Sequence, residues 1–249
     1  MSLRCLSLAA LLAVSPAWAG ELRVCAEPDN LPYSHADESG FENRIARLLA
    51  AELNATLAYT WFLQRRAFVR KTAGMCEVFI GVPSDFERLA TTRPYYRSTY
   101  VFVHRKDAPA PSFEDDLRKL RIGVQLPGND LAATPAGHAL ARRGAIDNVI
   151  GFPVYGARPA AERMVEAIAR GELDAAVVWG PAAAHFAHRN NLPVQPASAP
   201  AGFELPFEFA IAVGVRRGNR ELRDALDAAL ERRKQEIDAI LDEYRVPRL

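Results

Sequence analysis

The residues best suited to recognition lie in one short stretch between two expected strands. Cys76 to Val82 and Ser98 to Val103 are apolar runs rich in β-branched and aromatic residues, a pattern typical of strands. The segment between them carries guanidinium groups and phenol rings on Arg88, Arg93, Tyr95, Tyr96 and Arg97. Such side chains directly after a strand suit the mouth of a ligand cleft or a recognition surface.

The sequence contains no catalytic signature. We find no P-loop, no G-x-G-x-x-G, no G-x-S-x-G and no H-E-x-x-H. His185 and His188 could share one face of a helix as metal ligands, but no acidic partner is near, and a surface pair is favoured. Gly128-Asn129-Asp130 before an expected helix could offer backbone N–H groups to an anion, or it could be a simple turn.

Composition excludes some functions. The 249 residues carry a formal net charge of +1, so no electrostatic footprint indicates a nucleic acid or an anionic membrane as partner. About half of the residues are hydrophobic, which is enough for one large domain or two modest ones.

The N-terminus predicts export. Arg4 supplies a positive charge, Leu6 to Val14 form a short apolar core, and Ala17-Trp18-Ala19 fits a cleavage site. We expect residues 1–19 to be a signal peptide removed after Ala19, and the mature protein to lie in the periplasm. No other run is apolar and long enough to span a membrane.

Cleavage would leave two cysteines, Cys25 and Cys76. An even pair in an oxidising compartment favours a disulfide, whereas a redox or metal site would lack a C-x-x-C motif or a nearby histidine. Closing a loop of roughly 50 residues would stabilise the fold by on the order of 4 kcal/mol.

Hydrophobic periodicity predicts two α/β lobes. The first has strands at residues 22–26, 57–61 and 76–82, with helices after a capping box at Ser39-Gly40-Phe41-Glu42 and over residues 64–74. This alternation indicates a parallel sheet with helical crossovers.

The second lobe has strands at 120–125, 149–155 and 173–179, with helices at 159–170 and 182–189. A return strand at 207–215 precedes one long helix capped by Asn219, and Pro193 to Pro206 resembles a linker. We therefore expect lobe 1 at residues 20–103 plus 206–249, lobe 2 at 104–205, and two hinge strands between them.

The chain resembles a type II periplasmic solute-binding protein over its whole mature length. The ordered segments are L-R-V-C-A-E-P-D-N-L-P-Y from Leu22, G-F-E-N-R-I-A from Gly40, P-Y-Y-R-S-T-Y-V-F-V from Pro94 and G-E-L-D-A-A-V-V-W-G-P from Gly171. It is similar more narrowly to the MxaJ/XoxJ family, through W-F-L-Q-R-R-A-F-V-R from Trp61 and I-G-V-Q-L-P-G-N-D from Ile122. The resemblance implies an α/β fold of two lobes, each a mostly parallel sheet flanked by helices.

This family resemblance also implies a partner. The family is associated with PQQ-dependent methanol dehydrogenases, so we expect a non-catalytic protein that binds such an enzyme, and possibly its cytochrome c, and helps it mature. The resemblance leans to the XoxJ type, whose client depends on a lanthanide rather than calcium. No PQQ, calcium or lanthanide is expected on this protein itself. The alternatives are a transport receptor for a small organic solute and, more weakly, a carrier of PQQ or metal.

The resemblance departs from amino-acid-binding members at two positions. Their carboxylate-binding Arg corresponds to Arg88 in a shortened loop, and their ammonium-binding Asp corresponds to Trp179, which disfavours amino-acid transport and favours a wide aromatic cleft. The residues expected to line the cleft for a ligand or partner are Asp29, Tyr33, Arg65, Arg88, Arg93, Tyr95, Tyr96, Gln125, Asn129 and Trp179.

Overall fold

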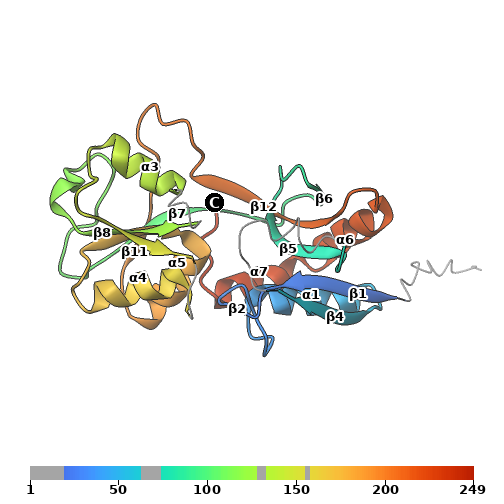
Figure 1. Ribbon diagram of the computed structural model, residues 1–249. Helices are drawn as coiled ribbons and strands as arrows, with labels where there is room; N and C mark the ends of the chain where they lie inside the picture. Colours follow the sequence, from blue (N-terminus) through green and yellow to red (C-terminus); the bar gives the residue numbers. More distant parts are fainter. Residues whose placement is uncertain (1–19, 63–73, 128–132, 155–157) are drawn as a thin grey trace, which may run out of the picture.

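The computed structural model describes residues 20–62, 74–127, 133–154 and 158–249, which form two α/β lobes side by side (Figure 1). The predicted helix at 64–74 falls almost wholly outside these residues, as do Arg65 and Asn129. The first lobe contains β1 (Glu21–Ala26), β2 (Asp29–Asn30), β3 (Ser34–His35), α1 (Phe41–Glu52), β4 (Thr56–Trp61), β5 (Val78–Pro83), β6 (Leu89–Thr91), β12 (Glu208–Arg216), α6 (Arg220–Arg232) and α7 (Lys234–Glu243).

The second lobe begins within β7 (Tyr96–His104), which both lobes share. Its other elements are the 3₁₀ helix η1 (Leu117–Lys119), β8 (Ile122–Leu126), α3 (Pro135–Arg142), β9 (Val149–Pro153), α4 (Ala160–Ala169), β10 (Ala175–Trp179), α5 (Gly180–Arg189) and β11 (Val194–Pro196).

The first lobe is a parallel sheet with helices packed on it, as its sequence pattern predicts. β1 lies between β4 and β5 and runs parallel to both. Leu22 of β1 and Ile45 and Leu49 of α1 are fully buried in one apolar cluster, to which α6 and α7 add residues such as Leu226. The spacing of apolar residues along α1 therefore turns one face of the helix onto the sheet.

The second lobe is a sheet covered on both faces. β8 pairs in parallel with β9 and β10, and β10 runs antiparallel to β7. One apolar cluster joins α4 and α5 to the sheet around Met164 and Phe186, and another joins α3 to the opposite face around Leu140. Side chains that alternate along β7 supply both clusters.

Two long strands connect the lobes. The first half of β7 pairs with β12 from Tyr96 to Thr99, and the second half pairs with β10 from Tyr100 to His104. The ladder is thus continuous from β4 at one end to β9 at the other. The predicted crossing strands are present, while the lobe boundaries at residues 103 and 206 stay a prediction.

The C-terminal residues reinforce this crossing. The Ser98 hydroxyl donates to the Pro247 carbonyl over 2.6 Å, and the Leu249 backbone N–H donates to the Arg97 carbonyl over 3.2 Å. Gly180, where α5 begins, fits here because a Cβ would lie 2.5 Å from the Thr99 carbonyl oxygen. Figure 1 shows the C-terminus between the two lobes.

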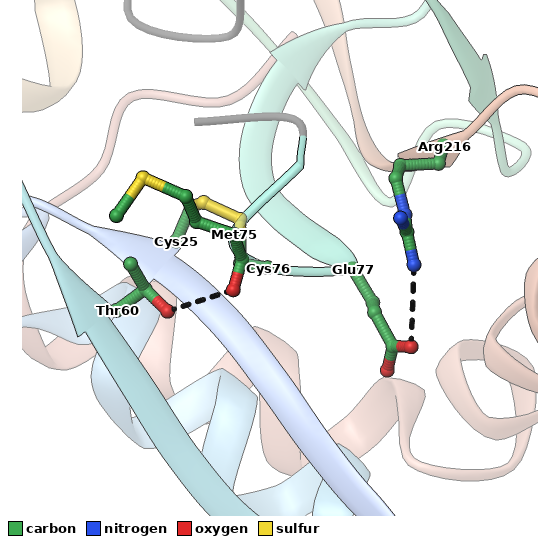
Figure 2. The surroundings of a disulfide bond; sticks show 6 residues. All are labelled: Cys25, Thr60, Met75, Cys76, Glu77 and Arg216. Carbon is green, nitrogen blue, oxygen red and sulfur yellow. Dashed lines mark hydrogen bonds and ion pairs between the residues drawn. A yellow bond between two sulfur atoms is a disulfide. The ribbon is translucent and has the colours of Figure 1, made fainter. Parts of the chain in front are cut away.

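The predicted disulfide between Cys25 and Cys76 is confirmed, with 5.4 Å between the Cα atoms (Figure 2). Cys25 lies near the end of β1, and Cys76 lies two residues before β5. Next to the bridge, the Thr60 hydroxyl donates to the Met75 carbonyl over 3.2 Å. The bridge therefore joins the carboxyl end of β1 to the segment that leads into the neighbouring β5.

Three local predictions were wrong. The predicted C-terminal helix is two helices, α6 and α7, with Arg233 between them, and the predicted linker contains β11, which pairs with β7. The N-cap of α1 is Gly40 rather than Ser39. Residue 40 must be a glycine, because the Tyr33 carbonyl oxygen lies 2.1 Å from where a Cβ would stand. Asn43 then takes the third helical position.

Candidate functional site

The carboxyl ends of the parallel strands in the first lobe mark the candidate site. β1 ends at Ala26, β4 at Trp61 and β5 at Pro83, and Glu27 follows β1 directly. Ligands of open α/β sheets bind at this edge, because loops and helix starts converge there. The loop from β1 to α1 carries Tyr33, so it brings this residue to the same edge.

Glu42 lies at the centre of the site. It is the second residue of α1, and its carboxyl packs against Gly81 of β5, where a Cβ would lie 1.9 Å from the Glu42 Oε1. Gly81 also has φ +74, a conformation that favours glycine. A glycine at this position therefore makes room for the acid.

The environment of Glu42 disfavours its charge. Burial raises the pKa of the Glu42 carboxyl to about 8, and the neighbouring Glu27 carboxylate contributes to the rise. The side chain is only partly accessible to solvent, and it has no ion-pair partner among the described residues. Asn43, not Glu42, accepts the hydrogen bond from the Gly40 N–H that closes the helix start. Glu42 is therefore a neutral acid at pH 7, with no part in capping the helix.

Tyrosines surround this acid. Burial raises the pKa of Tyr33, Tyr59, Tyr95 and Tyr96, and the nearby Glu42 carboxylate raises each pKa further. The rings of Tyr95 and Tyr96 lie 5.0 Å apart, edge to face. The Tyr95 hydroxyl is buried without a hydrogen-bond partner in the described part of the chain. The site thus combines an uncharged acid with several phenol groups.

Tyr33 connects the two lobes. Its ring lies 5.3 Å from that of Phe41, and it packs against the apolar cluster of each lobe. Its hydroxyl lies against the backbone N–H of Ala182 in the first turn of α5, which opposes the rise in its pKa. α5 has no side-chain cap of its own, so the Tyr33 hydroxyl serves one of its free N–H groups.

Trp179 lies where β10 ends and α5 begins. Its ring contacts those of Tyr100 and Phe209 edge to face, at centroid distances of 5.6 and 5.5 Å. It is half-buried and packs against clusters from both lobes. Burial also raises the pKa of Tyr100 to about 12, so this phenol stays neutral beside the Trp179 ring.

The other predicted residues spread over several surfaces. The Arg93 Nε donates to the Asp227 Oδ2 over 2.7 Å, so the Arg93 guanidinium is paired with an acid on α6. Tyr96 is only 7% exposed. Arg88 is exposed before β6, and Asp29 is exposed 3.8 Å from the His35 Nε2. Gln125 is half-buried near the end of β8. The structure therefore brings together Tyr33, Tyr95 and Tyr96 around Glu42, and it places Trp179 at the lobe junction.

Glu42 was missed as a site residue because the sequence assigns it to a capping box. A capping box requires an acid or amide at this position, so the motif already explained Glu42 and gave no reason to look for a binding role. The signal that could have revealed it is the glycine before Phe41, since a glycine N-cap leaves no side chain for a capping box. The neighbouring Glu27 at a strand end was a second signal.

The described residues contain no group of three or more His, Cys, Asp or Glu side chains placed to hold a metal ion. His185 instead stacks on Tyr244, with 5.7 Å between ring centroids and 19° between planes. None of the helices in the described ranges has the length and apolar character needed to cross a bilayer.

Comparisons with known proteins agree with this architecture. Residues 22–246 match the model of the bacterial extracellular solute-binding proteins, family 3. Protein MoxJ of Paracoccus denitrificans is 34% identical and covers 97% of this chain and 94% of its own length. Protein MoxJ of Methylorubrum extorquens is 32% identical, covering 92% of this chain and 82% of its own.

Solved structures extend the comparison to the fold. The periplasmic binding protein XoxJ of Methylobacterium extorquens AM1 has a TM-score of 0.75 at 32% identity and covers 92% of this chain and 99% of that one. MxaJ of Methlophaga aminisulfidivorans MPT has a TM-score of 0.80 at 25% identity, covering 92% and 100%. The two-lobed type II periplasmic-binding-protein fold and the resemblance to MxaJ and XoxJ are thus confirmed. The chain belongs to family 3 of the bacterial extracellular solute-binding proteins.

Proposed function

We propose that this protein is a non-catalytic periplasmic accessory protein that binds a PQQ-dependent methanol dehydrogenase and helps it mature or become active. The observation that carries the proposal is the similarity to MoxJ over nearly the whole of both chains. We further propose that residues 1–19 direct export and are removed after Ala19.

The geometry of the lobe junction supports a protein partner over a free amino acid. An ammonium group is held best by a carboxylate, whereas β10 ends at Trp179, whose ring packs on Tyr100 and Phe209. Aromatic side chains of this kind are frequent at the centres of protein interfaces. We propose that the junction between the lobes receives a segment of the dehydrogenase.

We propose a lanthanide-dependent, XoxF-type client, with the cytochrome c of the same system as a possible second partner. What supports this choice is the sequence similarity to XoxJ, which is 32% identical over 92% of this chain. The TM-score is higher for MxaJ, so the sequence carries this part of the proposal.

Co-purification of tagged protein with each type of dehydrogenase tests the proposal. We expect a complex with the lanthanide enzyme and faster activation of that enzyme when the protein is present. The lanthanide and calcium enzymes, assayed in parallel, serve as each other's control. The proposal is wrong if neither enzyme associates and neither changes its activation.

A second candidate is a transport receptor for a small organic solute. The observation that favours it is the partly enclosed Glu42, a polar group of the kind that fixes a small ligand. A solute bound by the native state raises the melting temperature by mass action. A thermal-shift screen of periplasmic solutes without the dehydrogenase would therefore distinguish this function from the first.

A further inference from the structure

Glu42 neither caps the start of α1 nor forms an ion pair among the described residues. Asn43 accepts the hydrogen bond from the Gly40 N–H, and no described cation pairs with Glu42. The carboxyl lies instead against Gly81, at a position that a larger residue would fill. An enclosed acid without a partner costs stability, which indicates a role in binding.

Among the described residues, the titratable groups that face Glu42 are acids and phenols. They are Glu27 after β1, Tyr33 in the loop before α1, Tyr59 on β4, and Tyr95 and Tyr96 at the start of β7. None of the four phenols carries a positive charge, and Glu42 itself becomes an anion when it ionises, so these described groups favour a positive ligand. Phenol rings also attract cations through their π faces.

The Tyr95 hydroxyl gives independent support. It is buried at this site and has no hydrogen-bond partner in the described part of the chain. Buried polar groups in native proteins are nearly always paired, so an orphaned hydroxyl beside an unpaired acid indicates a missing polar group. A cationic N–H group could donate to the Tyr95 Oη and to the Glu42 carboxylate together.

We propose that the Glu42 site receives an organic cation, an ammonium or guanidinium group, supplied by a basic side chain of the bound dehydrogenase. This inference rests on the proposed function. The long stem of a Lys or Arg side chain suits the aromatic walls, because its methylene groups pack on rings while its charged end reaches the acid. A carboxylate at position 179 is not needed in addition to Glu42. The basic side chain of a protein partner brings no free α-amino group that such a carboxylate would have to neutralise.

The proposal predicts proton release on binding. Glu42 is protonated at pH 7, because its pKa is about 8, and an arriving cation would ionise it. Calorimetric titration with the dehydrogenase at pH 7 in two buffers of different ionisation enthalpy should show release of about one proton per complex.

Glu42→Gln is the most informative substitution, because Gln resembles the protonated acid in shape and charge and the variant should fold normally. It should bind at least about tenfold more weakly and release no proton from this site.

Glu221→Gln provides the matched control. Glu221 is also the second residue of a helix, α6, but it is exposed. This variant should bind and release protons as the wild type does. Equal binding and equal proton release for wild type and Glu42→Gln would overturn the inference while leaving the proposed function intact.

A parallel titration with n-butylammonium and n-propylguanidinium separates the sources of the cation. If the dehydrogenase fails to bind the wild type, the proposed function fails, and so does the assignment to a dehydrogenase side chain. Binding of a free probe to wild type but not to Glu42→Gln would then identify a receptor for organic cations. Failure of both the enzyme and the probes would overturn the cation chemistry as well.

Discussion

Glu42→Gln should stabilise the protein, and the gain should grow with pH. The native pKa of Glu42 is about 8, while the ordinary value of the carboxyl is 4.5. Between these values the unfolded chain loses the proton and the native protein keeps it. The ionised unfolded state is then favoured, so the contribution of Glu42 to stability falls from about pH 4.5 to pH 8 and is constant above.

The magnitude follows from the width of that pH range. At about 1.4 kcal/mol per pH unit, the full loss would be about 5 kcal/mol. The side chain is largely enclosed, so we take about 5 kcal/mol as the upper end of the expected effect. Gln does not titrate and therefore removes this loss.

Urea unfolding of both proteins at several pH values from 4 to 9 measures the effect. The difference in unfolding free energy between Glu42→Gln and wild type should be small near pH 4 and should reach up to about 5 kcal/mol in favour of Gln near pH 9. Glu221→Gln should show no such trend, because that acid is exposed. A difference that stays constant with pH would refute the reasoning, and so would one that grows toward acid.

Three further predictions concern the supports of the site. Gly81→Ala should lower the unfolding free energy measured in urea by about 2 kcal/mol or more, because the added Cβ would clash with the Glu42 carboxyl and residue 81 also has a positive φ. Gly144→Ala is the control: φ is +72 there but nothing lies within 4 Å, so only the backbone strain of about 1 kcal/mol should be lost. Tyr33→Phe should destabilise the contact between the lobes by about 1 kcal/mol, because it removes the hydroxyl that meets the Ala182 N–H, and it should enlarge the radius of gyration in X-ray scattering. Tyr59→Phe should leave the radius of gyration unchanged, because the Tyr59 hydroxyl donates to the Asn43 carbonyl within lobe 1. Replacing both Cys25 and Cys76 by Ser should lower the unfolding free energy by up to about 4 kcal/mol for a sequence separation of 51, and an unchanged urea midpoint would contradict this.

Local sequence signals were sufficient to predict most of the fold. Apolar alternation places β1, β4 and β5, and the Asn219 side chain accepts from the Leu222 N–H at the start of α6 as predicted. These features depend on residues close together in the chain. The break at Arg233 was not visible in this way, because the apolar stripe continues through it and Arg233 pairs with the distant Glu52.

The site was harder to predict, because its chemistry depends on residues from separate elements. Arg93 reads as a cleft residue in the sequence, yet Asp227 from α6 binds its guanidinium. Glu42 acquires its raised pKa only where α1 meets Gly81 and Glu27. Residue type can suggest which side chains bind, but enclosure by distant segments decides which of them are perturbed.

The hydrogen bonds from Ser98 and Leu249 give the hinge a third point of attachment beside β7 and β12. A rotation of one lobe against the other must bend β7 and β12, and the C-terminal segment stiffens β7 at Arg97 and Ser98. We therefore expect the bend to lie beyond Ser98, toward the second lobe. Truncation at Pro247 would soften the joint, and an affinity tag fused after Leu249 would begin beside the hinge.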